Sequence, residues 1–324
     1  MAQESIKISK ADLTKFTSDI FVAAGLSREH ADEWAKMLVW ANLRGTDSHG
    51  IIRIPRYIDL INAKSISAKP NIRIERNLGA AIVLEADRAP AAVAMTQGMD
   101  EAIAAAKKVG IGWCAVRNTT HTGAIGYFAL HAAEQGFAGI ATSASGPMMA
   151  YPGTRVPAVS SNPIAFAVPR KDGRPYLLDF STGVVANGKI MGAADRGEKI
   201  PVGWGLDKDG KDTTDPRAVE TLLPLGGAKG AGLSFMIECL TSLALGNPLI
   251  ASALRGLKPK TIDDVALAYQ KAYNDSKASI LAHIDRCATP GRSSKQTPPA
   301  IAQMAAYPWP LPDVEDILEN EECI

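Results

Sequence analysis

Helix and strand patterns alternate along the middle of the chain, and this alternation most limits how the chain can fold. An alanine-rich helical stretch from about Ala91 to Lys108 ends at Gly110 and is followed by an apolar run, Ile111 to Val116. A loop, a second helix from about Gly123 to Glu134 and a buried strand from Gly139 to Ser143 continue the series. Helices interleaved with short apolar strands predict a layered α/β domain. The loops after its strands are where such domains usually bind ligands.

More elements of the same kinds follow. Apolar runs predict strands at Ile164 to Val168 and Tyr176 to Phe180, joined by an Arg-Lys-Asp-Gly turn at 170 to 173. A helix from about Gly230 to Ala244 opens with the glycine-rich run 226 to 230, Gly-Gly-Ala-Lys-Gly. Together these elements extend the α/β region to about residue 235.

The first sixty residues predict a small helical unit instead. Ser9 precedes a helical run that ends near Gly25, and Ser27 opens a second helix that reaches about Leu43. An Asp-Ser-His-Gly turn then leads into a third helix with Pro55 in its first turn, where a missing backbone N–H is tolerated.

The length of 324 residues exceeds the usual size of one hydrophobic core, so we expect two connected domains. We expect a helical, substrate-binding domain of residues 1–75 plus about 236–324, and an NAD(P)-binding α/β domain of residues 76–235. Beyond residue 247 the pattern weakens, and residues 287–299 are rich in Ser, Thr and Pro.

Charge and cysteine content exclude several classes of protein. Lys plus Arg number 35 and Asp plus Glu 34, so no net charge draws the chain to nucleic acid or to an anionic membrane. The N-terminal residues lack the apolar core of a signal peptide, and no run has the length of a membrane-spanning helix. Four scattered cysteines lack metal-binding spacing and predict structural thiols. We therefore expect a cytoplasmic protein. The cysteines are Cys114, Cys239, Cys287 and Cys323.

The segment from Ala41 to Ile58 carries the chain's most reactive pattern. Ser48 and His49 lie where a loop becomes a helix, and Arg53 and Tyr57 follow His49 at four-residue intervals. Four-residue spacing places side chains along one helix face. An acid/base group, a guanidinium and a phenol on one face could hold a small carboxylate while a proton moves.

Other interpretations of this segment remain open. A histidine near a helix start can simply bind backbone groups, and the Arg-Tyr face can pack against acidic residues. Ser48 beside His49 resembles a hydrolase nucleophile with its base, but the chain has no Gly-x-Ser-x-Gly elbow and adjacent residues seldom face each other. Asp47, His49 and His121 could bind a metal ion, yet none lies in a typical metal-binding spacing. We predict no metal site.

No standard nucleotide fingerprint is present. The chain lacks both Gly-x-Gly-x-x-Gly after a strand and the phosphate-binding P-loop, which argues against a conventional Rossmann domain. Two glycine-containing helix starts, 121–124 and 226–230, could still bind phosphate through backbone amides and Lys229. The alternative is that they are ordinary helix boundaries with a solvated lysine.

Several separated segments together resemble one family, the type 2 malate/L-lactate dehydrogenases. This family also includes ureidoglycolate, sulfolactate and diketogulonate oxidoreductases and cyclic-imine carboxylate reductases. The segments that carry the resemblance are RGTDSHGIIR (44–53), HTGAIGY (121–127), SNPIAF (161–166), LDFST (178–182), ANGKI (186–190), GWGLD (203–207) and GGAKG (226–230). The resemblance implies a non-Rossmann NAD(P)-dependent fold, usually homodimeric, and an activity that interconverts a small 2-oxo acid and its 2-hydroxy acid with NAD or NADP.

Site roles follow from the same resemblance. Ser48 and His49 would form a proton-relay pair, and His121 would be a second acid/base residue near the nicotinamide. Arg53 would bind the substrate carboxylate, and Ser161, at a position where threonine is common, would line the substrate pocket with Tyr57. The cofactor-binding positions would be Thr122, Gly123, Ala124, Ile125, Asp179, Phe180, Ser181, Ala228 and Lys229.

Two departures from the family pattern bear on function. Lys189 stands where imine-reducing members tend to carry an acidic residue, which favours the hydroxy-acid branch. The family's Pro-Gly-Glu segment near the C-terminus, which returns to the cofactor, is matched here only by Thr289-Pro290-Gly291-Arg292 in a different context. The alternative is therefore a catalytically silent relative that acts as a binding or structural protein, and a hydrolase is a third possibility.

Overall fold

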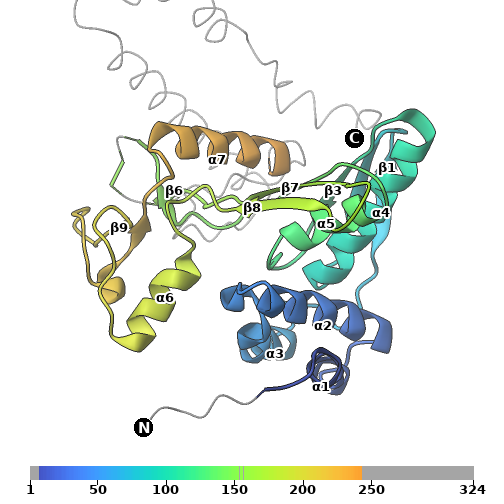
Figure 1. Ribbon diagram of the computed structural model, residues 1–324, viewed down its shortest axis with the longest axis horizontal. Helices are drawn as coiled ribbons and strands as arrows, with labels where there is room; N and C mark the ends of the chain where they lie inside the picture. Colours follow the sequence, from blue (N-terminus) through green and yellow to red (C-terminus); the bar gives the residue numbers. More distant parts are fainter. Residues whose placement is uncertain (1–6, 153, 156, 243–324) are drawn as a thin grey trace, which may run out of the picture. The chain divides into compact units, whose positions relative to one another are not determined.

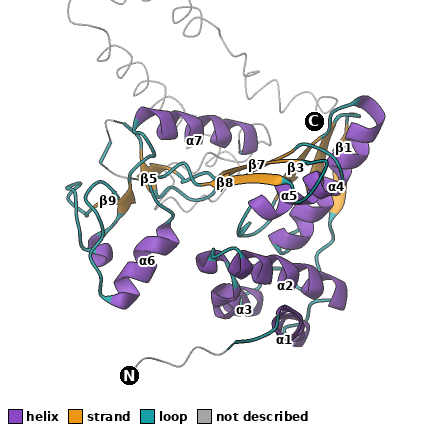
Figure 2. Cartoon of the chain, viewed as in Figure 1, coloured by secondary structure: helices purple, strands orange, loops and turns teal. Residues whose placement is uncertain are grey.

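The computed structural model describes residues 7–152, 154–155 and 157–242 (Figures 1 and 2). All of them lie in one of the two compact units into which the chain divides, residues 1–269. Four expectations lie outside the described residues: the end of the helix at Ala244, the polar stretch 287–299 with its Pro-Gly pair, and Cys287 and Cys323. The division into domains 1–75 plus 236–324 and 76–235 stays a prediction.

The N-terminal unit begins with two helices, α1 (Lys10–Ala23) and α2 (Arg28–Leu43). Ser9 and Ser27 are their N-caps, and each hydroxyl accepts the backbone N–H three residues further on. An N-cap of this kind contributes about 1 kcal/mol to helix stability. The predicted starts of both helices are confirmed.

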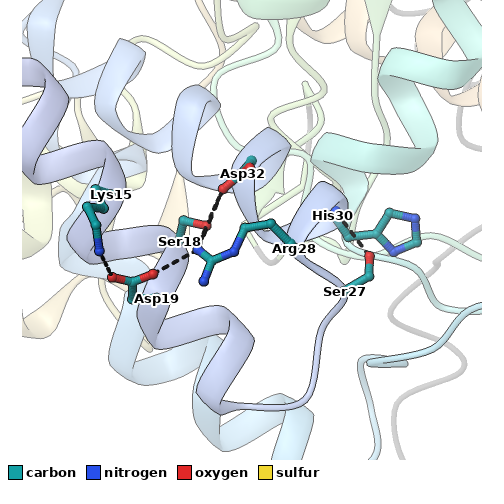
Figure 3. Close-up of polar contacts among 7 residues, drawn as sticks. All are labelled: Lys15, Ser18, Asp19, Ser27, Arg28, His30 and Asp32. Carbon is teal, nitrogen blue, oxygen red and sulfur yellow. Dashed lines mark hydrogen bonds and ion pairs between the residues drawn. The ribbon is translucent and has the colours of Figure 1, made fainter.

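Polar contacts join α1 to the start of α2 (Figure 3). Arg28 donates to the carboxylate of Asp19 at 2.8 Å and to the hydroxyl of Ser18 at 2.9 Å. Lys15 forms an ion pair with Asp19 at 2.6 Å, and the Ser18 hydroxyl donates to Asp32. Because the ionic groups are largely exposed, each pair adds only about 0–1 kcal/mol.

An aromatic stack supplies the main packing of this unit. The rings of Phe21 and Trp34 are parallel with centroids 4.3 Å apart, and Trp34 contacts Tyr57 at 4.7 Å. All three side chains are buried. Tyr57 lies on α3 (Ile54–Asn62), so the stack fixes the position of this third helix.

The third helix begins later than the sequence predicts. Two short 3₁₀ turns, η1 (Asp47–His49) and η2 (Ile51–Arg53), separate α2 from α3. Because Pro55 occupies the first turn of α3, regular helical bonding begins after Arg53. His49 and Arg53 therefore lie on 3₁₀ turns and not on one α-helical face with Tyr57.

The first sheet contains β1 (Arg73–Asn77), β2 (Ala81–Glu85) and β3 (Trp113–Arg117). β1 and β2 are antiparallel, whereas β2 and β3 are parallel and joined by the helix α4 (Ala91–Val109). Gly110 ends α4 in the left-handed conformation, with φ of 87°, which glycine adopts without strain. This β-α-β crossover is the α/β arrangement that the sequence predicts.

A second sheet is antiparallel throughout. Its order is β4 (Gly139–Thr142), β7 (Ile164–Val168) and β8 (Tyr176–Phe180), and α5 (Gly126–Glu134) packs on it. Both predicted strands 164–168 and 176–180 are confirmed.

One hydrophobic core joins the N-terminal helices to this second sheet. Trp34 of α2, Phe128 of α5 and Ala165 of β7 belong to the same buried cluster. The shared core matters for function because it holds the loop before α5 beside the N-terminal unit.

The remaining elements were not all predicted. Four short strands form a sheet of order β6-β5-β10-β9: β5 (Met149–Ala150), β6 (Pro157–Val159), β9 (Gly205–Leu206) and β10 (Thr221–Leu222). The helix α6 (Asn187–Arg196) and the 3₁₀ turn η3 (Pro216–Ala218) also lack a sequence prediction, whereas α7 (Ala228–Thr241) matches the helix expected from about Gly230.

Candidate active site

Two adjacent polar side chains of the first 3₁₀ turn contact each other. Within η1, the Ser48 hydroxyl lies 2.9 Å from Nδ1 of His49. The sequence interpretation held that neighbouring residues seldom face each other, and here that expectation is wrong. A 3₁₀ turn changes the local side-chain directions relative to an extended loop, which allows this contact.

His49 lies against a second histidine from a distant part of the chain. The rings of His49 and His121 are nearly parallel, at 21°, with centroids 5.6 Å apart. His121 comes from the loop between β3 and α5. The structure thus brings together two of the residues that the resemblance marks as acid/base groups.

Tyr57 is the hydrogen-bond partner of the second histidine. Its hydroxyl lies 2.7 Å from Nδ1 of His121, and only 2% of Tyr57 is exposed. Because Tyr57 is fixed by the aromatic stack on Trp34, the hydrogen bond fixes the orientation of the imidazole. The observed contact of Tyr57 is therefore with His121, and its assignment to the substrate pocket stays a prediction.

The pKa values of these groups are shifted, although only Tyr57 is fully buried, while His49 is half-buried and His121 is exposed. Desolvation first, and then the positive charge of Arg53, lower the pKa of His49 to about 4. The pKa of His121 is also lowered to about 4, by desolvation and then by the charges of His49 and Arg53. Desolvation raises the pKa of Tyr57 to about 12. At neutral pH both imidazoles are therefore neutral and the phenol keeps its proton.

Arg53 supplies the positive charge of this cluster. Its Nε donates to the backbone carbonyl of Ser48 at 2.5 Å, which fixes the side chain beside η1. Within the described part of the chain, no carboxylate pairs with its guanidinium. The terminal nitrogens are thus suited to an incoming carboxylate, which guanidinium groups bind in a bidentate manner.

The loop from Thr122 to Ile125 is held by its neighbours. Asp179, on β8, accepts the backbone N–H of Gly126 at 2.8 Å at the start of α5. The Thr122 hydroxyl donates to that of Ser143 at 3.0 Å. Burial raises the pKa of Asp179, and the Gly126 N–H and the charge of Arg44 oppose this rise. The structure therefore joins two of the predicted cofactor segments.

Gly123 has a conformation that few other residues adopt. Its φ is 66°, and a Cβ there would come within 2.8 Å of Cε of Met37. A side chain at this position would be strained, and the end of the Met37 side chain would have to shift. The glycine therefore lets the loop run close to the N-terminal helices.

A third segment, the start of α7, has the features of an anion-binding helix end. Gly226 and Gly227 both have positive φ, and no side chain caps the first turn. Lys229 is exposed there and forms no ion pair in the described residues. Gly230 is buried so closely that a Cβ would lie 2.6 Å from the carbonyl oxygen of Thr182. The backbone N–H groups of Gly227, Lys229 and Gly230 donate to nearby backbone carbonyls. The exposed ammonium of Lys229 is therefore the group here that fits the phosphates of a dinucleotide.

Ser161 lies beside the predicted cofactor segment 179–181. Its carbonyl accepts the N–H of Thr182 at 3.3 Å, and its hydroxyl donates to the sulfur of Met148 at 3.4 Å. Ser181 accepts the N–H of Gly183, while Phe180 ends β8. Ser161 is thus joined to the segment 180–182, but in the described residues no hydrogen bond or ring contact joins it to the two histidines.

Two residues at the site lie in segments that the sequence analysis singled out, 41–58 and 186–190, but were given no role there. Asn42, near the end of α2, donates to Asp47 at 2.5 Å and accepts the backbone N–H of Ile51 at 2.9 Å. Gly188, in α6, lies so close to Ser48 that a Cβ would come within 2.9 Å of its hydroxyl. The spacing of Asn42 and Asp47 gives little signal, and the resemblance of segment 186–190 does not show that Gly188 contacts Ser48.

Two other kinds of feature are absent from the described residues. They contain no group of three or more His, Cys, Asp or Glu side chains that could hold a metal ion. No helix among them combines the length and apolar character needed to span a bilayer.

Comparisons with known proteins place this geometry in a family. A model of the malate/L-lactate dehydrogenases matches residues 8–304. The NAD(+)-dependent ureidoglycolate dehydrogenase of Escherichia coli K12 is 39% identical over 243 residues, which cover 75% of this chain and 70% of that protein. The malate dehydrogenase of Pyrococcus abyssi is 39% identical over 254 residues, covering 74% and 69%.

A solved structure agrees with the sequence relatives. The sulfolactate dehydrogenase of Methanocaldococcus jannaschii superposes with a TM-score of 0.68 at 36% identity, covering 74% of this chain and 70% of that one. The fold and these relatives therefore define an oxidoreductase of the non-Rossmann α/β class.

The chain belongs to the malate/L-lactate dehydrogenase family. It is an NAD(P)-dependent oxidoreductase of small 2-hydroxy and 2-oxo acids, as the resemblance implied. The predicted fold class and enzyme class are confirmed, and the comparisons give no support to a catalytically silent relative.

Proposed function

We propose that the chain oxidises a small 2-hydroxy carboxylate, reversibly, at the cluster of Ser48, His49, Arg53 and His121. The observation that carries this proposal is the pair of stacked, neutral imidazoles 5.6 Å apart beside a guanidinium without a carboxylate partner in the described residues. Removing a hydroxyl proton needs a neutral base, and binding the substrate's carboxylate needs a cation.

Each residue then has a defined task. Arg53 binds the substrate carboxylate and directs the hydroxyl toward the imidazoles. His49 takes the hydroxyl proton at Nε2, and Ser48, hydrogen-bonded to Nδ1, holds the ring and relays protons. His121 is the second acid/base group, oriented by Tyr57. Because the charge of His49 lowers the pKa of His121, protonation of one imidazole disfavours protonation of the other.

The cofactor would bind along the three segments that the family resemblance marks. Thr122 to Ile125, Asp179 to Ser181 and the residues Ala228 and Lys229 would hold NAD or NADP, with the start of α7 at the phosphates. The bound nicotinamide supplies the hydride acceptor in oxidation and the hydride donor in reduction. Ser161 would line the substrate pocket next to segment 180–182.

The class of substrate follows from the relatives and from Lys189. The relatives named above are dehydrogenases of ureidoglycolate, malate and sulfolactate, all small acids. Lys189, the residue after Gly188, is exposed. Imine-reducing members of the family tend to carry an acidic residue at the position of Lys189. A hydroxy acid, and not a cyclic imine, is therefore the proposed substrate. We also propose a cytoplasmic homodimer that binds neither nucleic acid nor membranes.

The test is a titration of the purified protein with NADH and NADPH, followed by cofactor fluorescence, and then a turnover assay. The assay offers malate, lactate, sulfolactate and ureidoglycolate with NAD and with NADP. Binding of one cofactor and its reduction by at least one of these acids supports the proposal. No binding of either cofactor would overturn it, and turnover of an ester or amide without any nicotinamide would favour a hydrolase instead.

A further inference from the structure

The segment that carries Ser48 and His49 has little structure of its own to fix it. It consists of two 3₁₀ turns, η1 and η2, and neither has a side-chain cap. Short 3₁₀ turns have poorer hydrogen-bond geometry than an α-helix. Something outside the segment must therefore hold the Ser48–His49 pair in place.

Asn42 reaches both sides of this pair. Its Nδ2 donates to Oδ1 of Asp47, the residue before Ser48, at 2.5 Å. Its Oδ1 accepts the backbone N–H of Ile51, two residues after His49, at 2.9 Å. One side chain thus joins η1 to η2 across the two functional residues.

Asn42 lies on a helix with a buried face, and the small residue Gly50 leaves room for its side chain. It lies near the end of α2, whose residues Trp34, Leu38 and Ala41 are fully buried. Gly50 packs directly against the amide, and a Cβ there would come within 2.7 Å of Nδ2 of Asn42. Because the φ of Gly50 is −93°, its need for glycine is one of space and not of backbone conformation.

We propose that Asn42 is a positioning residue for the Ser48–His49 pair, acting through its paired hydrogen bonds to Asp47 and to the backbone of Ile51. The inference rests on the proposed function insofar as it assigns proton transfer to that pair. Aspartate cannot replace Asn42, because two carboxylates would then face each other at positions 42 and 47. Alanine would remove both hydrogen bonds without changing the charge.

The experiment measures the ring pKa of His49 by NMR, together with kcat and the Kd for NADH. The ring of His49 faces His121, Arg53 and Ser48. In Asn42→Ala the turn loosens and His49 gains water, so its pKa should rise by about 1 or more toward the ordinary value. We expect kcat to fall by about tenfold or more, with Kd for NADH changed by less than about twofold. Asn77→Ala, which removes an Asn side-chain bond in a remote turn, is the control and should change none of these.

A swap of the two side chains tests the contact itself. Asp47→Asn keeps an acceptor for Asn42 and should be near wild type, whereas Asn42→Asp should behave like Asn42→Ala. In the double variant Asn42→Asp with Asp47→Asn, the new amide donates to the new carboxylate, so both kcat and the His49 pKa should return toward wild type. The contrary result is a His49 pKa that follows net charge alone, falling in Asp47→Asn and rising in Asn42→Asp. In that case the hydrogen bond between the two side chains is not the cause.

The outcomes separate this inference from the proposed function. An unchanged His49 pKa in folded Asn42→Ala would overturn the positioning role. So would a loss of kcat that only follows a loss of folded protein, with the pKa unchanged. Should the wild-type protein show no turnover, the proposed function fails, and the pKa measurement still decides the role of Asn42.

Discussion

The hydroxyl of Tyr57 lies 2.7 Å from Nδ1 of His121, and this contact joins the aromatic core to the acid/base pair. We predict that Tyr57→Phe lowers kcat by about fivefold, since one neutral hydrogen bond is worth about 1 kcal/mol. The Kd for NADH should stay within about twofold. Steady-state kinetics and a fluorescence titration measure the two quantities.

A second tyrosine provides the matched control. Tyr127 donates to Glu33 at 2.9 Å and makes no contact with the histidines in the described residues. Tyr127→Phe should therefore leave kcat near wild type, although it loses a hydrogen bond to a carboxylate that is stronger than a neutral one. Equal losses in both variants would show that the Tyr57 contact has no special role in the reaction.

The low pKa values of the two histidines predict opposite pH profiles for the two directions. Oxidation needs a neutral imidazole, so its kcat/KM should be constant from pH 8 to about 5 and decline only near the pKa of about 4. Reduction needs a protonated imidazole, so its kcat/KM should fall about tenfold per pH unit above that pKa. An oxidation profile that instead declines below pH 7 would mean that the base has an ordinary histidine pKa.

The same groups predict how folding stability depends on pH. His49 and His121 have pKa values of about 4 in the folded chain, against an ordinary histidine pKa of 6.5. Between these values the unfolded state binds more protons, so the free energy of unfolding decreases as pH falls from 6.5 to 4. Urea unfolding at several pH values measures this slope. Replacing both histidines by asparagine should flatten it, and a slope left unchanged would place the proton uptake elsewhere.

Gly188 predicts a sharp contrast within one helix. In Gly188→Ala the new Cβ collides with Ser48, which should cost about 1–3 kcal/mol of stability and lower kcat. Gly192→Ala, one turn further along α6, meets only the flexible end of Arg196 at 3.2 Å and should be neutral or stabilising by up to about 1 kcal/mol. Thermal unfolding and kcat of the two variants provide the comparison. Similar behaviour of both would show that α6 can move away from Ser48 without consequence.

Much of the fold could be predicted because local signals agree with it. Ser9 and Ser27 cap their helices as their positions suggest, and the apolar runs at 164–168 and 176–180 form strands with the predicted bounds. The strands β5, β6, β9 and β10 could not be predicted, because elements of two or three residues have no periodicity and depend on distant partners.

The candidate site was predictable in its residues but not in its geometry. Ser48, His49 and Arg53 stand out as residue types, yet the spacing placed them on a helix that begins only at Ile54. The contact of His121 with both His49 and Tyr57 spans 64 or more residues, so it depends on the shared core and has no local signal. Asn42 shows its role only once η1 and η2 are seen to lack caps.

The central claim is that the stacked histidines carry out proton transfer in nicotinamide-dependent oxidation of a hydroxy acid. The most direct measurement is kcat for NAD(P) reduction in the wild type, His49→Ala and His121→Ala, beside the Kd for the cofactor in each. We expect kcat to fall by about 10²-fold or more in both variants while the Kd stays within about twofold, in line with loss of a general base. Unchanged turnover in either variant, with cofactor still bound, would contradict the account.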